Sequence, residues 1–473
     1  MPFSILLFLL SSVAFAEPVR HMMMIGGGGE STSLNTTIFD LAFYEMGNYL
    51  SNNKWSSDVL FNGGHSNSEN ILDTKFSTSH RRAPFTSKNY ADLIASYIAK
   101  INTGEIMPGE QLLIYIDSHG AEKSGNGGDL THNISIGSAV GTLDLNKLSG
   151  SDLVSLDSLK QLQALAEAKG IKLAILDMSC HSGNTLALAD AKTCVISSTG
   201  PNHYGYSNFS SYFIRNMAPG KSLEDVFLKT RNQIAEPAFP MISSYAGNTI
   251  FNSLYPALTP FLFYHGDNHA DKLTPFLLKS AETCHLTITS DSQLFTQIQL
   301  LEDQLGTLVD TSALKTLIEE YKVSQENALR ALNAMGASER TQKTTFSKMV
   351  VLGSKRENVH LDYSLAELMS INFDNPITYF TRQAQSSKGF DAAVYSAQVE
   401  LSTQAKAKQA ELRLQNPDLA DYENKSHKLI AQMNDTYDIA SQIAVEENKL
   451  YQQLYGDLSK QDRGPNACKD FVL

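Results

Sequence analysis

A histidine and a cysteine at the ends of two apolar runs are the residues of this sequence best suited to chemistry. The run Leu112–Ile116 leads into Asp-Ser-His119-Gly, and the run Leu173–Leu176 leads into Asp-Met-Ser-Cys180. Both runs have the length and apolar character of strands buried in a parallel sheet. Sites of α/β proteins lie at the carboxyl ends of such strands, so we expect His119 and Cys180 to face one cleft.

A thiol beside an imidazole suits nucleophilic catalysis. The Cys180 thiolate would attack a carbonyl carbon, and His119 would carry protons to and from the reacting groups. The oxyanion that forms needs N–H donors. We assign these to the backbone of Gly120, which has no side chain to block a substrate, and to that of Cys180. This chemistry is expected to use neither a metal ion nor a cofactor.

The order of these motifs resembles that of the caspase–legumain superfamily of cysteine peptidases (clan CD), which includes caspases, metacaspases, legumains and gingipains. An apolar strand that ends in His-Gly precedes one that ends in Cys, and Ser182-Gly183 follows the cysteine. The order His119 before Cys180 is that of this family and the reverse of the papain-like order. The resemblance covers residues 20–260 and implies an endopeptidase that acts on proteins or peptides and is capable of self-processing.

The resemblance also implies where the substrate pocket lies. In the family, the residue two before the nucleophile forms the floor of the S1 pocket, and here that residue is Met178. The run Ile196–Gly200 is similar to the strand whose end lines the pocket, which adds Ser197 and Ser198. Because Met178 is apolar, we do not expect a strong preference for Asp or Arg at P1.

Other interpretations of these residues stay open. His119 and Cys180 could be an unrelated loop histidine and core cysteine, or a pair retained in an inactive homologue. His132 and His203 are alternative general bases, whereas His181 is expected to be structural. A zinc site of His119, Cys180 and His181 is a weaker alternative, because it lacks the paired short spacings of zinc ligands.

Four glycines, Gly26 to Gly29, follow the apolar run His21–Ile25. A glycine-rich loop after a strand can bind phosphate, but no Gly-Lys-Ser/Thr follows these glycines, and no Gly-x-Ser-x-Gly occurs elsewhere. An active-site loop is the better interpretation.

The pattern from Arg20 to Phe263 alternates apolar runs with amphipathic stretches, which predicts an α/β fold with a mainly parallel, caspase-like sheet sandwiched by helices. The predicted strands are His21–Ile25, Asp58–Phe61, Leu112–Ile116, Leu173–Leu176 and Cys194–Ser197. The predicted helices are Phe39–Tyr49, Tyr90–Ile101, Leu156–Ala168, Ser182–Asp190 and Ser222–Ala235.

The C-terminal part has a helical period instead. Leu294, Ile298, Leu301, Leu305 and Leu308 form a heptad seam, and similar stripes cover 314–335, 394–414 and 429–454, with a break at Pro417. This pattern predicts an all-α bundle or coiled coil, whose stripes serve core packing. We therefore expect a peptidase domain over 17–263, a linker over 264–290 and a helical domain over 291–473.

The N-terminus is expected to be a signal peptide over residues 1–16, because an apolar run precedes the small-x-small ending Ala14-Phe15-Ala16. We therefore expect an exported protein, periplasmic or secreted. This apolar run is too short to span a membrane, and no later run is long enough to do so. The formal net charge of −12 argues against a nucleic-acid partner.

Four cysteines occur in the chain, and an exported protein can form disulfides. Cys194 lies in an apolar run and is expected to be a buried core thiol. Cys284 and Cys468 lie in polar stretches near the ends of the C-terminal region, and we predict that they pair, with two free surface thiols as the alternative.

Two functions follow. The first is an exported cysteine endopeptidase with a His119/Cys180 dyad. The alternative is a catalytically inactive scaffold of the same fold, whose helical domain binds a protein partner.

Overall fold

The computed structural model describes residues 19–28, 37–53, 55–121, 130–136, 153–203, 205, 207–234, 238–258, 310–341, 348–353, 360–386, 389–461 and 464–473. The chain forms two compact units. The first comprises residues 1–234, 238–251 and 455–473, and the second comprises 235–237 and 252–454. The signal peptide expected over 1–16, the linker expected over 264–290, the heptad seam predicted over 294–308, Gly29 and Cys284 lie outside the described residues.

The first unit is built around a seven-stranded sheet in the order β10-β9-β8-β4-β1-β2-β3. All neighbours pair in parallel except β10, which runs antiparallel to β9. The strand order reverses between β1 and β4, where an α/β sheet opens a crevice at its carboxyl edge. The strands are β1 (Arg20–Gly26), β2 (Ser56–Phe61), β3 (Arg81–Ala83), β4 (Gln111–Asp117), β8 (Lys172–Asp177), β9 (Thr193–Ser197) and β10 (Met241–Ile242).

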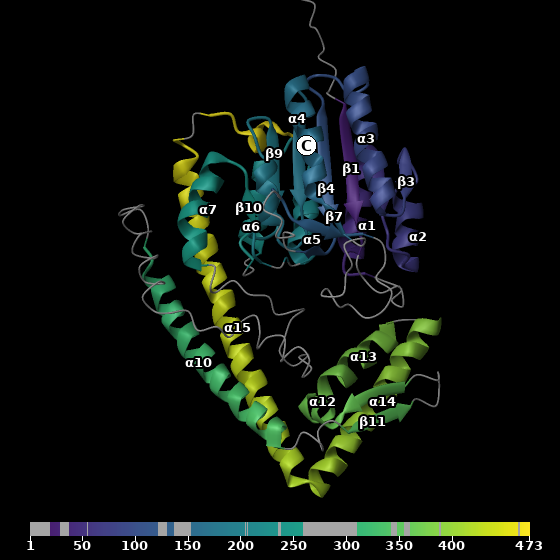
Figure 1. The fold of residues 1–473 in the computed structure, drawn as a ribbon, viewed down its shortest axis with the longest axis vertical. Helices are drawn as coiled ribbons and strands as arrows, with labels where there is room; N and C mark the ends of the chain where they lie inside the picture. Colours follow the sequence, from purple (N-terminus) through teal and green to yellow (C-terminus); the bar gives the residue numbers. More distant parts are fainter. Residues whose placement is uncertain are drawn as a thin grey trace, which may run out of the picture. The chain divides into compact units, whose positions relative to one another are not determined.

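Helices cover both faces of this sheet (Figure 1). Alternate strand residues such as Ile114 and Ile175 pack with Leu93 and Leu159 of α3 and α4. The intervening residues face the other layer, where the Tyr115 hydroxyl lies 2.5 Å from Ser210 Oγ of α5. The helices are α1 (Asp40–Asn53), α2 (Ser66–Lys75), α3 (Ser87–Thr103), η3 (Leu156–Ser158), α4 (Leu159–Lys169), η4 (Ser182–Leu188), α5 (Ser207–Asn216), α6 (Leu223–Gln233) and α7 (Tyr245–Leu258).

A small antiparallel sheet lies beyond the carboxyl end of β4. Its strands are β5 (Gly120–Ala121), β6 (Asn133–Ser135) and β7 (Leu153–Ser155), with β6 in the middle. Gly120 pairs with Ile134 in this sheet. The polypeptide that follows His119 is therefore held by backbone hydrogen bonds and not left as a free loop.

The second unit is mainly helical, as the sequence predicts, but it also contains a β-hairpin that the sequence analysis did not identify. Its elements are α10 (Ser312–Thr341), β11 (Met349–Gly353), β12 (His360–Ser364), α12 (Leu365–Ser370), α13 (Asp374–Ser386), α14 (Gly389–Gln415) and α15 (Pro417–Leu458). Pro417 is the first residue of α15, where a missing N–H costs no intrahelical hydrogen bond. The break predicted at Pro417 is thus a helix start. No helix in the described part of the chain is both long and apolar enough to cross a membrane.

The predicted pairing of Cys284 with Cys468 is wrong, because Cys468 forms a disulfide with Cys194. Their Cα atoms lie 4.6 Å apart although 274 positions separate them in sequence. Cys194 is buried in β9, as its apolar neighbours indicate, but it is a half-cystine and not a core thiol. The prediction placed Cys468 at the end of the helical domain because of its position in the sequence. In the structure, residues 455–473 belong to the first unit and bring Cys468 to β9.

The C-terminal segment is part of the first unit, so the predicted boundary of the helical domain at Leu473 is also wrong. The short helix α16 (Ala467–Asp470) lies beside β9, where Figure 1 shows the end of the chain in yellow. The Leu223 N–H donates to Phe471 O at 3.0 Å, and the Leu473 N–H donates to Lys221 O at 2.9 Å. Phe471 and Leu473 are both buried, which makes the segment part of the core.

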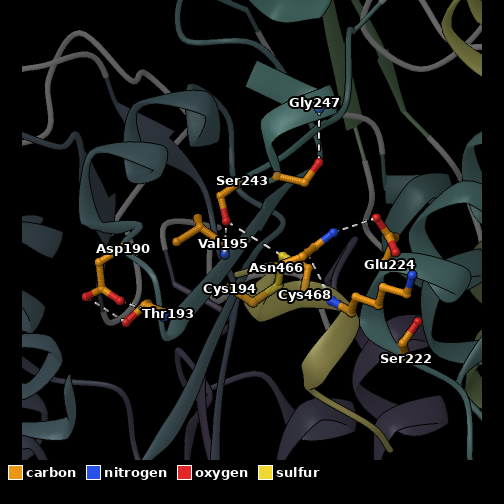
Figure 2. The surroundings of a disulfide bond; sticks show 12 residues. Asp190, Thr193, Cys194, Val195, Ser222, Glu224, Ser243, Gly247, Asn466 and Cys468 are labelled. Carbon is orange, nitrogen blue, oxygen red and sulfur yellow. Dashed lines mark hydrogen bonds between the residues drawn. A yellow bond between two sulfur atoms is a disulfide. The ribbon is translucent and has the colours of Figure 1, made fainter. Parts of the chain in front are cut away.

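Polar contacts surround the disulfide, as Figure 2 shows. Ser243 Oγ accepts from the Val195 N–H at 2.7 Å and lies 3.6 Å from Cys468 Sγ. The Asn466 amide donates to Glu224 of α6 at 2.9 Å. These contacts fix α16 between β9 and α6 on the face of the sheet opposite α3 and α4.

Replacing both half-cystines, Cys194→Ala with Cys468→Ala, is expected to destabilise the first unit by about 2–5 kcal/mol, because the disulfide restricts a long loop of the unfolded chain. Trp55 is the chain's single tryptophan, is buried and belongs to this unit, so its fluorescence during urea unfolding reports the change. Cys284→Ala is the control and should unfold like the wild type. An unchanged midpoint in the double variant would contradict the pairing.

Candidate active site

His119 stands two residues beyond the carboxyl end of β4, at the exit from the sheet. From Glu110 to Gly120 it is the one residue that is partly exposed. Its carbonyl accepts from the Ser135 N–H at 2.8 Å, and Ser118 Oγ donates to Ser135 O at 2.8 Å. The Phe39 ring meets the imidazole edge-on, with ring centroids 5.1 Å apart. Backbone and ring contacts therefore fix the imidazole in place.

Cys180 stands in the matching place on the neighbouring strand. β4 and β8 pair in parallel with Ile116 opposite Asp177, so the two strands leave the sheet at the same level. From Leu173 to Gly183, Cys180 is the one residue that is partly exposed. The two side chains predicted to act together are thus the ones that reach the surface at adjacent strand ends.

Gly120 joins these two segments by direct contact. A Cβ atom placed on Gly120 would lie 1.9 Å from Cys180 O and 2.9 Å from Cys180 N. No side chain fits in that space, so the residue after His119 must be glycine for its backbone to rest on that of Cys180. This contact places the backbone of the residue after His119 directly against the backbone of Cys180.

Backbone N–H groups converge on the thiol. The Gly205 N–H donates to Cys180 Sγ at 3.4 Å. Hydrogen bonds from the backbones of Gly205, Gly120 and Cys180 itself all lower the pKa of the thiol. Two of these donors, Gly120 and Cys180, are the predicted oxyanion donors. Gly205 was not predicted, because it follows β9 at a distance and its sequence context carries no motif.

Most of Cys180 is enclosed although part of the residue reaches the surface, and this burial has the larger effect on the thiol. It raises the pKa of Cys180 above the ordinary value, and the charge of Asp177 adds to the increase, against the lowering by the three N–H groups. At neutral pH the side chain is therefore a thiol, and a base must remove its proton before it can act as a nucleophile.

Two buried carboxyl groups lie beneath the site, at the ends of β4 and β8. Burial raises the pKa of Asp117 to about 7, while hydrogen bonds from Tyr115 and Ser210, each 2.9 Å long, oppose the increase. Burial likewise raises the pKa of Asp177 to about 6, although Ser179 and Thr185 donate to it. The like charge of Asp177 adds to the rise at Asp117. Neither carboxylate reaches the surface.

The alternative general bases are both buried. His132 is completely enclosed, with Nε2 2.8 Å from Ser179 Oγ, and His203 is 8% exposed. The structural role expected for His181 fits its position, since its Nδ1 lies 3.2 Å from Pro201 O. Its backbone has a φ of 60°, a left-handed conformation that is uncommon outside glycine. Of the histidines considered, His119 is the one that is partly exposed, although its Nε2 atom is buried.

The predicted pocket residues lie close to Cys180, but all three are buried. Met178, Ser197 and Ser198 are 5%, 0% and 1% exposed. Ser197 Oγ donates to Thr199 O at 3.0 Å. Gly205 packs against Ser198 and the Met178 carbonyl, which brings it to the region assigned to the pocket. The assignment of these three residues to a substrate pocket remains a prediction.

The glycines at the end of β1 contact the segment of chain that leads to His119. The Gly27 N–H donates to Asp117 O at 2.9 Å, and the Gly28 N–H donates to Ser118 Oγ at 3.2 Å. A Cβ on Gly26 would lie 1.9 Å from Asp117 O. These N–H groups are thus used within the protein, which argues against a phosphate cradle and agrees with an active-site loop.

Within the described ranges, no three His, Cys, Asp or Glu side chains are arranged to hold a metal ion. His119, Cys180 and His181 do not form such a group. The chain matches no known family model, and no curated protein is significantly similar to it. The functional interpretation therefore depends on the geometry of the site.

The pKa of Asp117 predicts how stability depends on pH. Between pH 4 and 7 the folded protein holds a proton on Asp117 that the unfolded chain has lost, so the free energy of unfolding should fall as pH rises through this window. At about 1.4 kcal/mol per pKa unit, Asp117 should account for up to about 4 kcal/mol of the decrease in the free energy of unfolding, and Asp117→Asn should abolish that part of the decrease.

Urea unfolding followed by Trp55 fluorescence at pH 4 to 7 measures this dependence. Asp92→Asn is the control, because Lys88 lowers the pKa of the exposed Asp92 and places its contribution below this window. Equal pH dependence in Asp117→Asn and the wild type would contradict the assignment.

Proposed function

We propose that the chain is an exported cysteine endopeptidase of the caspase–legumain type, with Cys180 as nucleophile and His119 as general acid and base. The observation that carries the proposal is the pair of partly exposed side chains at the ends of β4 and β8, whose backbones touch through Gly120. A buried structural cysteine beside an unrelated histidine would not need a glycine at their contact or N–H groups around the sulfur.

The proposed reaction follows from the geometry. When a peptide binds, His119 takes the proton of the Cys180 thiol, and the thiolate attacks the scissile carbonyl carbon. The carbonyl oxygen becomes an oxyanion and receives hydrogen bonds from the N–H groups of Gly120 and Cys180. The C–N bond breaks as His119 gives its proton to the leaving amine, and water then hydrolyses the thioester with His119 as base.

The raised pKa of Cys180 assigns His119 a definite task. Because burial keeps the sulfur protonated at neutral pH, the free protein holds a weak nucleophile, and proton removal belongs to the reaction itself. The same N–H groups that surround the sulfur would be free to bind the substrate oxygen once the sulfur is bonded to carbon. The site is thus suited to react with bound acyl substrates.

Export to an oxidising compartment is supported by the disulfide. Such bonds persist in secreted and periplasmic proteins and are rare in the cytosol. The Cys194–Cys468 bond joins buried residues of the catalytic unit, so the fold relies on it. This agrees with a signal peptide at residues 1–16.

Cys180→Ala is expected to abolish cleavage of a peptide library, because it removes the nucleophile, and to abolish labelling of the protein by an acyloxymethyl ketone probe. Mass spectrometry of the labelled wild type should place the adduct on Cys180. Cys284→Ala is the matched control and should keep both properties. Cleavage that persists in Cys180→Ala would refute the proposal.

The inactive-scaffold alternative is favoured by the raised pKa of the Cys180 thiol and makes a different prediction. In that case the wild type would cleave no library peptide, and the probe would label Cys180 no faster than a surface thiol. The comparison of wild type with Cys180→Ala therefore separates the two functions.

Gly120→Ala is expected to lower kcat by about 10²-fold or more, because the added methyl displaces the Cys180 backbone and its oxyanion donor. Gly456→Ala is the control, since a Cβ there meets nothing within 4 Å. Steady-state kinetics on one fluorogenic peptide chosen from the library measures both variants. Equal kcat values would show that the Gly120 contact has no role in the reaction.

A further inference from the structure

A chain of buried polar side chains runs beside the candidate active site without belonging to the dyad. His132, completely buried, places Nε2 2.8 Å from Ser179 Oγ. Ser179 Oγ lies 2.6 Å from Asp177 Oδ1, and the Ser179 N–H donates to the same oxygen at 3.0 Å. His132 Nε2 also lies 3.6 Å from Asp177 Oδ2. Ser179 is the residue immediately before Cys180.

The direction of each hydrogen bond follows from the number of protons. Ser179 has one hydroxyl proton, and the ionised Asp177 carboxylate can only accept, so Ser179 donates to Asp177. Ser179 Oγ must then accept from His132, which carries its proton on Nε2. The set contains a serine, a histidine and an aspartate, but the serine gives its proton to the aspartate and all three are buried. It is therefore not a second nucleophilic site.

The two ends of this chain of hydrogen bonds lie on the two catalytic segments. His132 directly precedes β6, which pairs with β5 at Gly120, and Ser135 of β6 holds the His119 carbonyl. Ser179 and Asp177 belong to the turn that carries Cys180. Together with the Gly120 contact, this side-chain connection ties β6, which holds the His119 carbonyl, to the residue before Cys180.

Further contacts keep His132 from moving. The Leu156 N–H donates to the His132 carbonyl at 3.2 Å, and Asp157 accepts from the Thr131 N–H at 2.8 Å. Thr185 of η4 donates to Asp177 Oδ2 at 2.6 Å. Backbone and side-chain hydrogen bonds thus hold both His132 and Asp177 in place. A displacement of His132 would therefore displace Ser179 as well.

We propose that His132 and Ser179 are positioning residues, whose buried hydrogen bond sets the placement of His119 and Gly120 relative to Cys180. This rests on the proposed function for its effect on catalysis, although the link itself also governs the environment of the thiol. A displacement of about 1 Å between reacting groups can cost about 10²-fold in rate, so loss of the link should act mainly on kcat.

The test compares His132→Ala, His132→Gln and Ser179→Ala in the full-length protein. The amide of Gln can donate a proton where His132 Nε2 does, so His132→Gln should restore most of the activity that His132→Ala loses. His65→Ala is the matched control, because His65 is also completely buried in the first unit but lies at the start of α2. Melting temperature, kcat and KM on a fluorogenic peptide, and the rate of Cys180 alkylation by iodoacetamide are measured for each.

We expect His132→Ala and Ser179→Ala to lower kcat about 10²-fold with little change in KM, and their double variant to lose no more than either alone, because both remove one connection. His65→Ala should lose melting temperature but keep kcat. Equal kcat losses in His132→Ala and His132→Gln, or full additivity in the double variant, would overturn the proposal. Should His132→Ala not fold, Ser179→Ala with His132→Gln provides the same comparison.

The alkylation rate separates this proposal from the peptidase function. A wild type that cleaves no peptide would refute the peptidase function. The hydrogen bond between His132 and Ser179 would still be supported if Ser179→Ala and His132→Ala changed the alkylation rate and His132→Gln restored it. An alkylation rate equal in all variants, with or without peptide cleavage, would refute the link.

Discussion

The parallel pairing of β4 with β8 is the constraint on which the rest of the site depends. Because Ile116 lies opposite Asp177, two chain segments leave the sheet at one level and must pass each other at its edge. They do so with their backbones in contact, and Gly120 is the residue that allows it. A one-residue change in register would turn every side chain to the other face and separate His119 from Cys180. The positions of His119 and Cys180 are thus set by the sheet, and the segments beyond the strands complete them.

The cost of this arrangement is the burial of polar groups under the strand ends. Burial removes the hydration of the Asp117 and Asp177 carboxylates. The hydrogen bonds that these groups receive offset only part of that loss, so the pKa of both is raised. The same enclosure holds Cys180 as a thiol. A low dielectric strengthens every dipole near the sulfur, including the N–H groups that surround it. Burial therefore opposes formation of the thiolate in the free protein. In the proposed reaction, the same burial would strengthen the hydrogen bonds from these N–H groups to an oxyanion.

The strands of the sheet could be predicted from the sequence because their signal is local. Each apolar run, from His21–Ile25 to Cys194–Ser197, is confirmed as a strand, and the positions of His119 and Cys180 beyond two of them follow directly. The 3₁₀ helix η4 replaces the α-helix expected after Cys180, and α2, α5 and α7 were not identified, because polar or aromatic residues interrupt their periodicity. Gly205, the His132–Ser179 hydrogen bond and the Cys194–Cys468 disulfide could not be predicted, since each joins residues that only the folded chain brings together.

The disulfide also constrains how the fold is completed. Cys194 belongs to the sheet, whereas Cys468 lies among the last residues of the chain, so the bond can form only after nearly the whole sequence is available. The first unit thus remains without α16 and the buried Phe471 and Leu473 while the intervening second unit is made. During that interval Cys180 and Cys194 are both thiols, close in sequence. Mispairing is opposed by the sheet itself, because Cys194 faces the helix layer of α6 while Cys180 lies beyond the end of β8. A parallel sheet formed before the C-terminal segment arrives would therefore keep Cys180 apart from Cys194 and leave Cys194 to pair with Cys468.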